Sequence, residues 1–278
     1  MDNFMYDDII LTALKEDITS RDITTDYIIP PKQESAAYLE AKADGIICGI
    51  DIAARVFELL GGIEFVSKIK DGDRVKQKDI IAELKGNTRV ILKGERTALN
   101  ILQHLSGIAT KSAECAALVS GTRTVICDTR KTLPGLRALQ KYAVTVGGGR
   151  NHRYNLSDAV LIKDNHIDAA GGIDKAIATV RGKIPHTAKI ETETRNFAEV
   201  KTAVSSGADI IMLDNFSLDD IPVAISYIRK TDPRILIELS GGITESNLRD
   251  YAKFGADIIS LGALTHSVTA FDISLKFA

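Results

Sequence analysis

This chain is poor in cysteine, lacks any long apolar run and is almost neutral, and each of these features excludes a class of protein. Its three cysteines are odd in number and show no metal-ligand spacing, so we expect buried free thiols and not a disulfide framework. No apolar stretch approaches the roughly 18 to 20 residues that cross a bilayer. The first ten residues carry aspartates and no basic segment, which argues against an export signal and predicts a cytoplasmic protein.

Charge is balanced over the whole chain, with 35 Lys plus Arg against 37 Asp plus Glu. A nucleic-acid or membrane-surface binder usually carries a basic excess over a face or a domain, so we expect neither partner. One stretch, however, lacks acidic residues: every charged side chain between Arg130 and Ser157 is basic. Three glycines at 147–149 and an imidazole at His152 lie among these cations, which favours a site for a small anion over a merely solvated basic face.

From about residue 110 the sequence repeats a strand-and-helix unit. Short apolar, β-branched runs alternate with segments of helical spacing, which is typical of buried parallel strands joined by helices. The runs occupy residues 124–128, 159–163, 188–193, 209–214, 235–239 and 257–261. This order predicts a (β/α) barrel, complete or one unit short, with an open doubly wound sheet as the alternative.

Polar residues follow the ends of these expected strands, where barrel enzymes carry their chemistry. They lie at 128–131, 163–166, 193, 214–215, 240–242 and 262–264. Glycines after the last two strands can bind phosphate through backbone N–H groups, although a lone glycine often only ends a strand. The nearby basic stretch favours the phosphate interpretation.

Residues 1 to about 110 have a different pattern. Apolar spacing predicts a short helix near residues 9–14, strands at 36–41, 45–49 and 80–84, and a helix at 51–60. A longer linking helix is predicted over 93–110, where apolar residues recur every three or four positions. His104 on this helix is expected to be a structural histidine and not a ligand.

Several longer motifs occur in a fixed order along the chain. They are Glu-Arg-Thr-Ala-Leu-Asn at 95–100, Leu-Ser-Gly-Ile-Ala-Thr at 105–110, Asp-Thr-Arg-Lys-Thr at 128–132, Gly-Gly-Gly-Arg-Asn-His-Arg at 147–153, Ile-Lys-Asp-Asn-His at 162–166, Leu-Asp-Asn-Phe at 213–216, Ser-Gly-Gly at 240–242 and Gly-Ala-Leu-Thr-His-Ser at 262–267. Together they closely resemble the quinolinate phosphoribosyltransferase family over nearly the whole chain. One departure is Ser20-Arg21, where the family commonly has Gly-Asp.

The resemblance implies an α/β fold of two domains. Residues 1–110 would form an N-terminal α+β sandwich domain, and residues 111–266 the incomplete (β/α) barrel of type II phosphoribosyltransferases. The tail 267–278 would pack back on the first domain. The family forms homodimers with shared active sites, and we expect the same here.

The resemblance also implies the reaction. Quinolinate and phosphoribosyl pyrophosphate would give nicotinate mononucleotide, pyrophosphate and CO2 in NAD biosynthesis, with Mg²⁺ as cofactor. Quinolinate would be bound by Arg96 from a neighbouring subunit, Thr129, Arg130, His152, Arg153 and Lys163. Phosphoribosyl pyrophosphate would be bound by Lys131, Glu193, Asp214, Ser240, Gly241, Gly242, Gly262, Ala263 and Leu264.

Four of these residues would act in catalysis, namely Lys131, Lys163, Glu193 and Asp214. Arginine forks suit the adjacent carboxylates of quinolinate, and Glu193 with Asp214 would hold either the ribose hydroxyls or Mg²⁺ beside the substrate phosphates. Two other hypotheses stay open. One is a relative that takes a monocarboxylate such as nicotinate, or that is associated with molybdate transport. The other is a non-catalytic phosphosugar-binding barrel.

Overall fold

The structure is a computed structural model that describes residues 6–278, and the chain clusters into two compact units. The N-terminal unit comprises the chain up to Ala113 together with Thr132–Gly148 and Leu264–Ala278. The barrel unit comprises Glu114–Lys131 and Gly149–Ala263. The sequence-based division placed residues 111–113, 132–148 and 264–266 in the barrel domain, whereas here they cluster with the N-terminal unit.

Contacts of helix α5 (Arg137–Val146) explain why residues 132–148 join the N-terminal unit. The hydroxyl of Tyr142 donates to Asp71 at 2.8 Å, and Gln140 Nε2 lies 2.7 Å from His104 Nε2. The basic stretch of the sequence is therefore not one continuous loop. Two of its cations, Arg137 and Lys141, lie on α5, and Lys141 is buried there.

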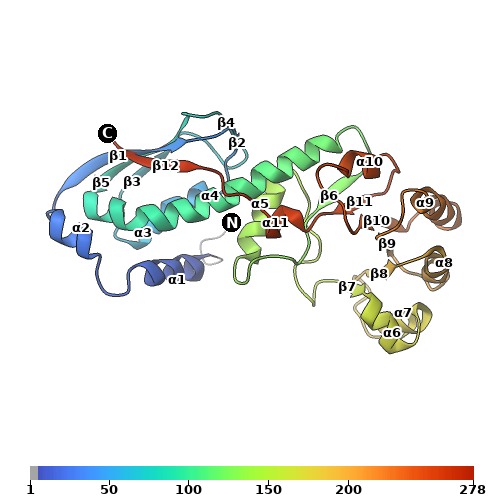
Figure 1. Ribbon diagram of the computed structural model, residues 1–278. Coiled ribbons are helices and arrows are strands. Elements are labelled where there is room, and N and C mark those ends of the chain that lie inside the picture. Colours follow the sequence, from blue (N-terminus) through green and yellow to red (C-terminus); the bar gives the residue numbers. More distant parts are fainter. Residues whose placement is uncertain (1–5) are drawn as a thin grey trace. The chain divides into compact units, whose positions relative to one another are not determined.

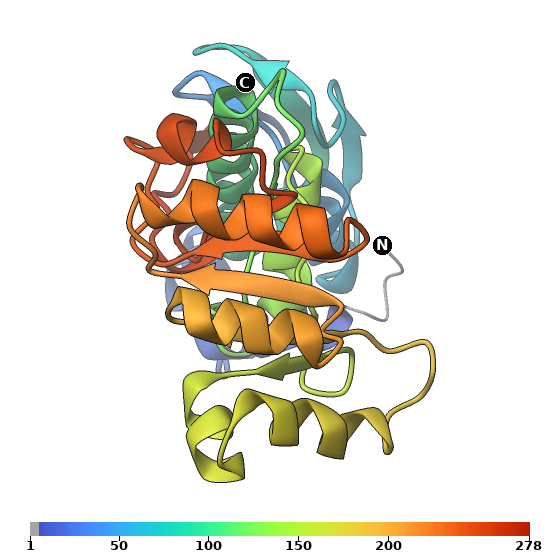
Figure 2. The same ribbon diagram turned by 90° about the vertical axis from the view of Figure 1, so that its right-hand side faces the viewer.

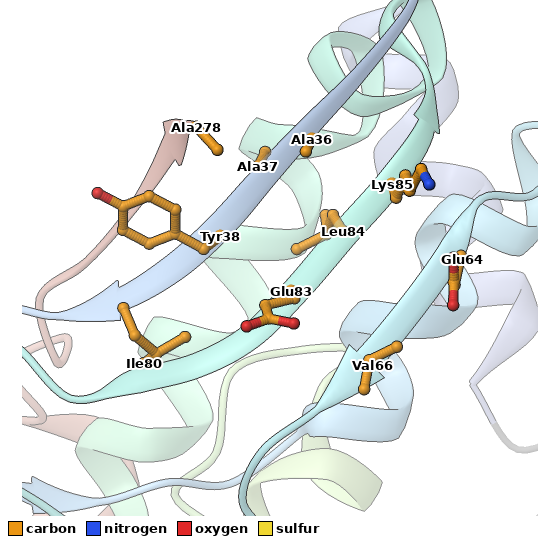
Figure 3. Close-up of a pocket in the computed structure, with 10 residues that line it drawn as sticks. All are labelled: Ala36, Ala37, Tyr38, Glu64, Val66, Ile80, Glu83, Leu84, Lys85 and Ala278. Carbon is orange, nitrogen blue, oxygen red and sulfur yellow. The ribbon is translucent and has the colours of Figure 1, made fainter.

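An antiparallel sheet with the strand order β12-β1-β5-β3 is the framework of the N-terminal unit. Its strands are β1 (Glu34–Ala41), β3 (Glu64–Ser67), β5 (Ile80–Asn87) and β12 (Ile273–Phe277), and a second small sheet pairs β2 (Gly45–Ile46) with β4 (Arg74–Val75). Leu39 and Ala82, which are register partners, are buried on one face of the larger sheet. Their neighbours Tyr38 and Glu83 lie on the other face and line a surface groove (Figure 3).

The helices of this unit are α1 (Asp7–Asp17), α2 (Ile23–Ile28), α3 (Ile50–Leu59) and α5, together with most of α4 (Thr88–Leu118) and of α11 (Ala263–His266). Figure 1 shows α3 and α4 on one side of the sheet. Helix α4 is longer at both ends than the expected linking helix, and it buries its apolar stripe, including Leu102 and Leu105. A Cβ at Gly107 would collide with the backbone oxygen of Thr269, so glycine allows the C-terminal segment to approach α4 closely.

The barrel unit contains a six-stranded parallel sheet whose strands match the six apolar runs of the sequence. They are β6 (Val125–Cys127), β7 (Val160–Ile162), β8 (Ile190–Thr194), β9 (Ile210–Asp214), β10 (Leu236–Ser240) and β11 (Ile258–Ser260). Helices α6 (Asp164–Ala170), α7 (Ile173–Arg181), α8 (Phe197–Ser205), α9 (Asp220–Thr231) and α10 (Leu248–Ala252) connect them. In Figure 2 the olive to orange helices α7, α8 and α9 lie in front of the strands as one outer layer.

The strand order β6-β11-β10-β9-β8-β7 defines an incomplete barrel. The order follows the chain from β7 to β11, and β6 then pairs with β11 on the far side. A doubly wound sheet would reverse its order at a switch point, and this sheet does not. Among the described residues β6 and β7 do not pair, so the barrel is open between its first two strands.

The structure bears on two expectations drawn from composition, one about the cysteines and one about membrane-spanning helices. Cys48, Cys115 and Cys127 are free and buried, which confirms that they act as small core residues. Among residues 6–278, no helix combines the length and the apolar character needed to cross a membrane.

Candidate active site

The register of the parallel sheet gathers acidic side chains on one of its faces. Glu193 on β8 pairs with Met212 on β9, and Met212 pairs with Glu238 on β10. Register partners share a face, and residues two apart along a strand share it as well. Glu191 therefore lies on the same face as Glu193, and Asp214 lies there too, because it is two residues beyond Met212. The face that carries these acids is the candidate site.

Two distant segments of the basic stretch are joined at the end of β6. Arg150 forms an isolated parallel bridge with Cys127, in which the Arg150 N–H donates to Ile126 and the Asp128 N–H donates to Arg150. The buried carboxylate of Asp128 also accepts the N–H of His152 at 2.9 Å. These bonds hold residues 128–131 beside residues 150–153, so the two basic motifs form one surface.

Arg130 and Arg153 lie within electrostatic reach of each other on this surface. Burial and the positive charge of Arg130 lower the pKa of Arg153, against the opposing influence of Glu191 and Glu193. Arg153 Nη1 donates to the carbonyl of Ala159 at 3.1 Å, and this bond closes the loop of residues 153–159. Two close guanidinium groups repel each other, and a bound dianion would relieve that repulsion.

Lys163 faces the acids from the end of β7. Its Nζ lies 2.5 Å from Glu193 Oε1, with the lysine side chain 47% exposed and the glutamate 12% exposed. Lys163 is also the N-cap of α6, where its N–H donates to Nδ1 of His166 at 3.0 Å. The backbone of Lys163 is thereby fixed, while its ammonium group remains accessible to an incoming anion.

Glu193 and Asp214 offer the oxygen ligands that a hard divalent cation prefers. Glu193 is the last residue but one of β8 and Asp214 is the last residue of β9, and Asp214 Oδ2 accepts a hydrogen bond from Asn215 Nδ2 at 2.8 Å. This donor set fits Mg²⁺ better than a softer metal.

The two glycines after β10 differ in their surroundings. Gly241 has φ +90, and a Cβ there would collide with the side chain of Asn215, so this glycine keeps the turn beside Asp214. Gly242 has φ +62 and faces open space, which leaves its backbone accessible. Gly241 thus has a structural reason to be glycine, and phosphate binding by the backbone of either glycine stays a prediction.

A cavity of about 420 Å³ opens beside Arg153 in the barrel unit. Its lining includes His152, Arg153, Tyr154 and Asp158 and the acids Glu191 and Glu238. Sequence reasoning did not assign Glu191 and Glu238 to the site. Each is an acidic residue inside an apolar strand run, and that pattern was the available signal for a buried functional carboxylate.

His152 connects these two buried carboxylates to the basic loop. Its Nε2 lies 3.0 Å from Glu191 Oε2 and 3.5 Å from Glu238 Oε2, and its Nδ1 accepts the Arg153 N–H at 2.8 Å. Burial lowers the pKa of His152, but its bonds to Glu191 and Glu238 outweigh burial and raise the pKa to about 10. Burial and repulsion by Glu238 raise the pKa of Glu191 to about 7.

Both shifts describe one proton that the cluster retains near neutral pH. Two arrangements of this cluster hold the same number of protons. In one, a doubly protonated His152 ring faces two ionised carboxylates. In the other, a neutral ring faces one ionised and one protonated carboxylate. Because Nδ1 of His152 accepts a hydrogen bond, it carries no proton in this arrangement. In this arrangement the ring's own proton lies on Nε2 and points to the carboxylates, and the additional proton lies on the acid pair.

The same three side chains have ligand atoms within 4.8 Å of one another, a spacing that could hold a metal ion. A metal-bound histidine normally donates its other ring N–H to an acceptor. Here that nitrogen, Nδ1 of His152, accepts from the Arg153 N–H. A metal on Nε2 would require the ring to lose both protons, so this cluster is better described as a hydrogen-bonded triad.

The other expected site residues follow the strands of the same sheet. Thr129 and Lys131 follow β6, Ser240 ends β10, and Gly262 and Ala263 follow β11. In a parallel sheet these carboxyl ends share one edge. Arg96 and Leu264 belong to the N-terminal unit and lie on α4 and α11.

Comparison with known proteins agrees with this fold and identifies the family. The models of the quinolinate phosphoribosyl transferase N-terminal and C-terminal domains match residues 22–106 and 108–276. A probable carboxylating nicotinate-nucleotide pyrophosphorylase of Methanocaldococcus jannaschii is 46% identical over 96% of this chain and 95% of its own. NadC from Streptococcus pyogenes, whose structure is solved, has a TM-score of 0.95 at 41% identity and covers 100% of this chain and 99% of its own. The resemblance inferred from the motifs is confirmed, and the chain belongs to the quinolinate phosphoribosyltransferase family.

Proposed function

We propose that this chain transfers the phosphoribosyl group of phosphoribosyl pyrophosphate to quinolinate, giving nicotinate mononucleotide, pyrophosphate and CO2 for NAD biosynthesis. One observation carries the proposal. In a chain of this family, Arg130, Arg153 and Lys163 converge on one face of the barrel sheet beside two acids, Glu193 and Asp214. Cations suit a dicarboxylate, and the acid pair suits a ribose or a metal ion.

Quinolinate binding would use the cations of the basic loop. The proposed binding group consists of Thr129, Arg130, Arg153 and Lys163, with Arg96 from a partner chain and His152, which lines the cavity beside Arg153. Planar guanidinium forks bind carboxylates bidentately, so two arginines match two adjacent carboxylates. A monocarboxylate such as nicotinate would leave part of the Arg130 and Arg153 repulsion unrelieved.

Phosphoribosyl pyrophosphate would lie along the carboxyl edge of the strands. Lys131, Glu193, Asp214, Ser240, Gly241, Gly242, Gly262, Ala263 and Leu264 form its proposed binding group. The accessible backbone at Gly242 suits a phosphate, as do the loops after the last strands of barrels in general. Glu193 and Asp214 would contact the ribose hydroxyls or hold Mg²⁺, and the bound ion would neutralise charge on the departing pyrophosphate.

Catalysis would depend mainly on charge and orientation. The bond from C1 of the ribose to pyrophosphate breaks with oxocarbenium character, and the pyridine nitrogen attacks C1. Lys131 would stabilise the leaving pyrophosphate, and Lys163 would move from Glu193 to a quinolinate carboxylate. The positive charge of the quaternised nitrogen then stabilises the carbanion left at C2 when the 2-carboxylate departs as CO2, and a proton adds to that carbon.

We further propose that the chain works in the cytoplasm as a homodimer with shared active sites. The proposal follows the resemblance, which gives Arg96 of each chain to the site of its partner. Isologous two-fold dimers are also the commonest soluble oligomers.

Comparing two substrates at equal concentration tests the proposed reaction. With phosphoribosyl pyrophosphate and Mg²⁺, quinolinate should give nicotinate mononucleotide while nicotinate gives little, as measured by chromatography. Preference for nicotinate would establish the monocarboxylate alternative. Binding of phosphoribosyl pyrophosphate without turnover of either acid would establish the non-catalytic barrel.

Metal removal tests the proposed role of the acids. Turnover should stop in a chelator and return with Mg²⁺, and Asp214→Asn should raise the Mg²⁺ concentration needed for half-maximal rate. Asp209→Asn is a matched control, because Asp209 lies at the start of β9 and pairs with Arg181. Full activity in the chelator would remove Mg²⁺ from the proposal.

A further inference from the structure

Gln140 is a polar residue at a fully buried position of α5. Its exposed fraction is 0%, and its buried neighbours on the helix include Leu139, Ala143 and Val144. Burying an amide is unfavourable unless its oxygen and its nitrogen are hydrogen-bonded. The partners of this amide therefore indicate why an apolar side chain does not stand at this position.

Three hydrogen bonds engage the Gln140 amide, and each reaches a different segment. Oε1 accepts the backbone N–H of Leu133 at 2.9 Å, in the loop after β6. Nε2 lies 2.7 Å from His104 Nε2 on α4 and 3.4 Å from the carbonyl oxygen of Thr265 on α11. Because the amide oxygen faces the Leu133 N–H, the NH2 group faces the other two partners and donates to both.

His104 and Thr265 fix the direction in which this amide points. Burial lowers the pKa of His104, which favours a neutral ring. A neutral ring can accept a hydrogen bond at Nε2 while it carries its proton on Nδ1. Turning the amide over would place its oxygen against the Thr265 carbonyl and against a lone pair of the ring. Oε1 of Gln140 is therefore held toward Leu133.

Gln140 holds the exposed segment that follows Lys131. Leu133 comes two residues after Lys131, and its side chain is 45% exposed, so apolar packing of that side chain does not fix the segment. Two hydrogen bonds to α5 fix it instead. The Leu133 N–H donates to Gln140, and Thr132 Oγ1 accepts from Arg137 Nε at 2.9 Å. Gln140 is fully buried and Arg137 is not, so we expect the Gln140 bond to restrict the backbone beside Lys131 more strongly.

We propose that Gln140 is a positioning residue that places Lys131 for phosphoribosyl pyrophosphate by holding the backbone N–H of Leu133. The inference rests on the proposed function, because Lys131 is taken there as a ligand of that substrate. Gln140 is buried and acts on the substrate only through Lys131. His104 keeps the amide of Gln140 in the orientation that this role requires.

Replacing Gln140 by methionine tests the positioning role. Gln140→Met keeps nearly the volume of the side chain but removes the acceptor for the Leu133 N–H. Because one hydrogen bond is lost, the KM and the dissociation constant for phosphoribosyl pyrophosphate should each rise about tenfold. The KM for quinolinate should stay within about twofold of wild type. A wild-type KM for phosphoribosyl pyrophosphate in folded Gln140→Met would overturn the proposal.

Gln103→Met is the matched control, because it makes the same exchange elsewhere in the N-terminal unit. Gln103 Nε2 donates to the carbonyl of Ile273 on β12 at 2.8 Å, and neither residue belongs to the segment after Lys131. This variant should lose stability in urea but keep both KM values. A rise in the KM for phosphoribosyl pyrophosphate equal to that of Gln140→Met would contradict a role specific to Gln140.

Leu133 provides a second pair of variants if Gln140→Met does not fold. Leu133→Pro removes the N–H from an exposed residue, whereas Leu133→Ala keeps it. The proline variant should raise the dissociation constant for phosphoribosyl pyrophosphate, and the alanine variant should match wild type. Equal constants for these two variants would overturn the proposal.

A double-mutant cycle with Lys131→Ala tests whether Gln140 acts through Lys131. Calorimetric binding of phosphoribosyl pyrophosphate with Mg²⁺ includes variants that turn over too slowly to assay. The double variant should stay within about twofold of Lys131→Ala alone, because no ammonium group is left to position. Effects that multiply would give Gln140 a route other than Lys131 and would overturn the proposal.

Amide hydrogen exchange of the whole protein distinguishes failure of this inference from failure of the proposed function. Without substrate, the Leu133 N–H should exchange slowly in wild type and faster in Gln140→Met, because Gln140 is its acceptor. Equal exchange in the two proteins would overturn the inference, whatever the activity. If wild type neither binds nor turns over phosphoribosyl pyrophosphate, the proposed function falls, while the exchange rates still decide whether Gln140 holds the segment.

Discussion

Lys163 is the site residue whose ion pair we expect to change when an anionic substrate binds. Its ammonium group is half exposed and is paired with Glu193, which also acts electrostatically on Arg153. A residue that neutralises an acid and can also bind an anion suits a site where charge is rearranged during the reaction.

We therefore expect Lys163→Ala to lower kcat/KM by the equivalent of about 2 to 4 kcal/mol, the usual cost of losing a charge-assisted bond in a shielded site. Circular dichroism should show a folded protein, because Lys163 is not a core residue. Lys183→Ala, in an exposed loop of the same unit, should behave as wild type. A Lys163→Ala enzyme with near wild-type kcat/KM would exclude this residue from the site.

At the scale of single residues, the sequence predicted candidate site residues where a charged side chain differs from its neighbours. Arg130, Arg153, Lys163, Glu193 and Asp214 could be selected because they end apolar runs or belong to a stretch without acids. Glu191 and Glu238 could not be paired, since nothing in either strand indicates that the register places both beneath His152. The distance between the two carboxylates depends on the order of the strands in the folded sheet.

Among the elements, β11 is preceded by Asp257, which links several segments of the barrel unit. Asp257 accepts the Ile237 N–H at 2.8 Å and forms ion pairs with Arg123 and Arg229. Burial alone would raise the pKa of Asp257, but its bonds to Arg229 and Ile237 outweigh burial and lower the pKa from 3.8. The carboxylate thus links β10, α9 and the segment before β6.

Asp257→Asn should therefore lower the free energy of unfolding by about 1 to 3 kcal/mol at pH 7. Because the folded pKa is below 3.8, the contribution is complete above that value and is lost as pH falls through the folded pKa. Urea denaturation of both proteins should show the difference at neutral pH and a smaller one near pH 3. A difference that grows with acidity would contradict the lowered pKa. Asp250→Asn is a surface control, because its pair with Lys253 is exposed.

The element pattern was well predicted where periodicity is strong. All six barrel strands were found because each is a short apolar run between helical segments. The helix α5 was missed because its basic residues were interpreted as an anion-binding stretch, and the edge strand β3 was missed because its polar ends, Glu64 and Ser67, weaken the strand signal.

At the scale of the whole molecule, the proposed dimer gives each active site residues from two chains. Arg96 lies on α4 and Lys163 follows β7, in different units of the chain. If the partner supplies Arg96, inactive Arg96→Ala and Lys163→Ala proteins should complement each other. Each mixed dimer would regenerate one intact site.

Equal amounts of the two variants, unfolded and refolded together, should recover about a quarter of wild-type activity, because random pairing makes half the dimers mixed with one good site in two. Each variant refolded alone should stay inactive. Mixed dimers that form, as shown by differently tagged chains, but remain inactive would place Arg96 outside the partner's site.

Release of the 2-carboxyl carbon of quinolinate is the most direct test of the whole proposal. With label in that carbon, the wild-type protein should release one labelled CO2 for each nicotinate mononucleotide and each pyrophosphate formed. Release should require both phosphoribosyl pyrophosphate and Mg²⁺. No labelled CO2 from the folded protein at saturating substrate and metal would contradict the proposed reaction.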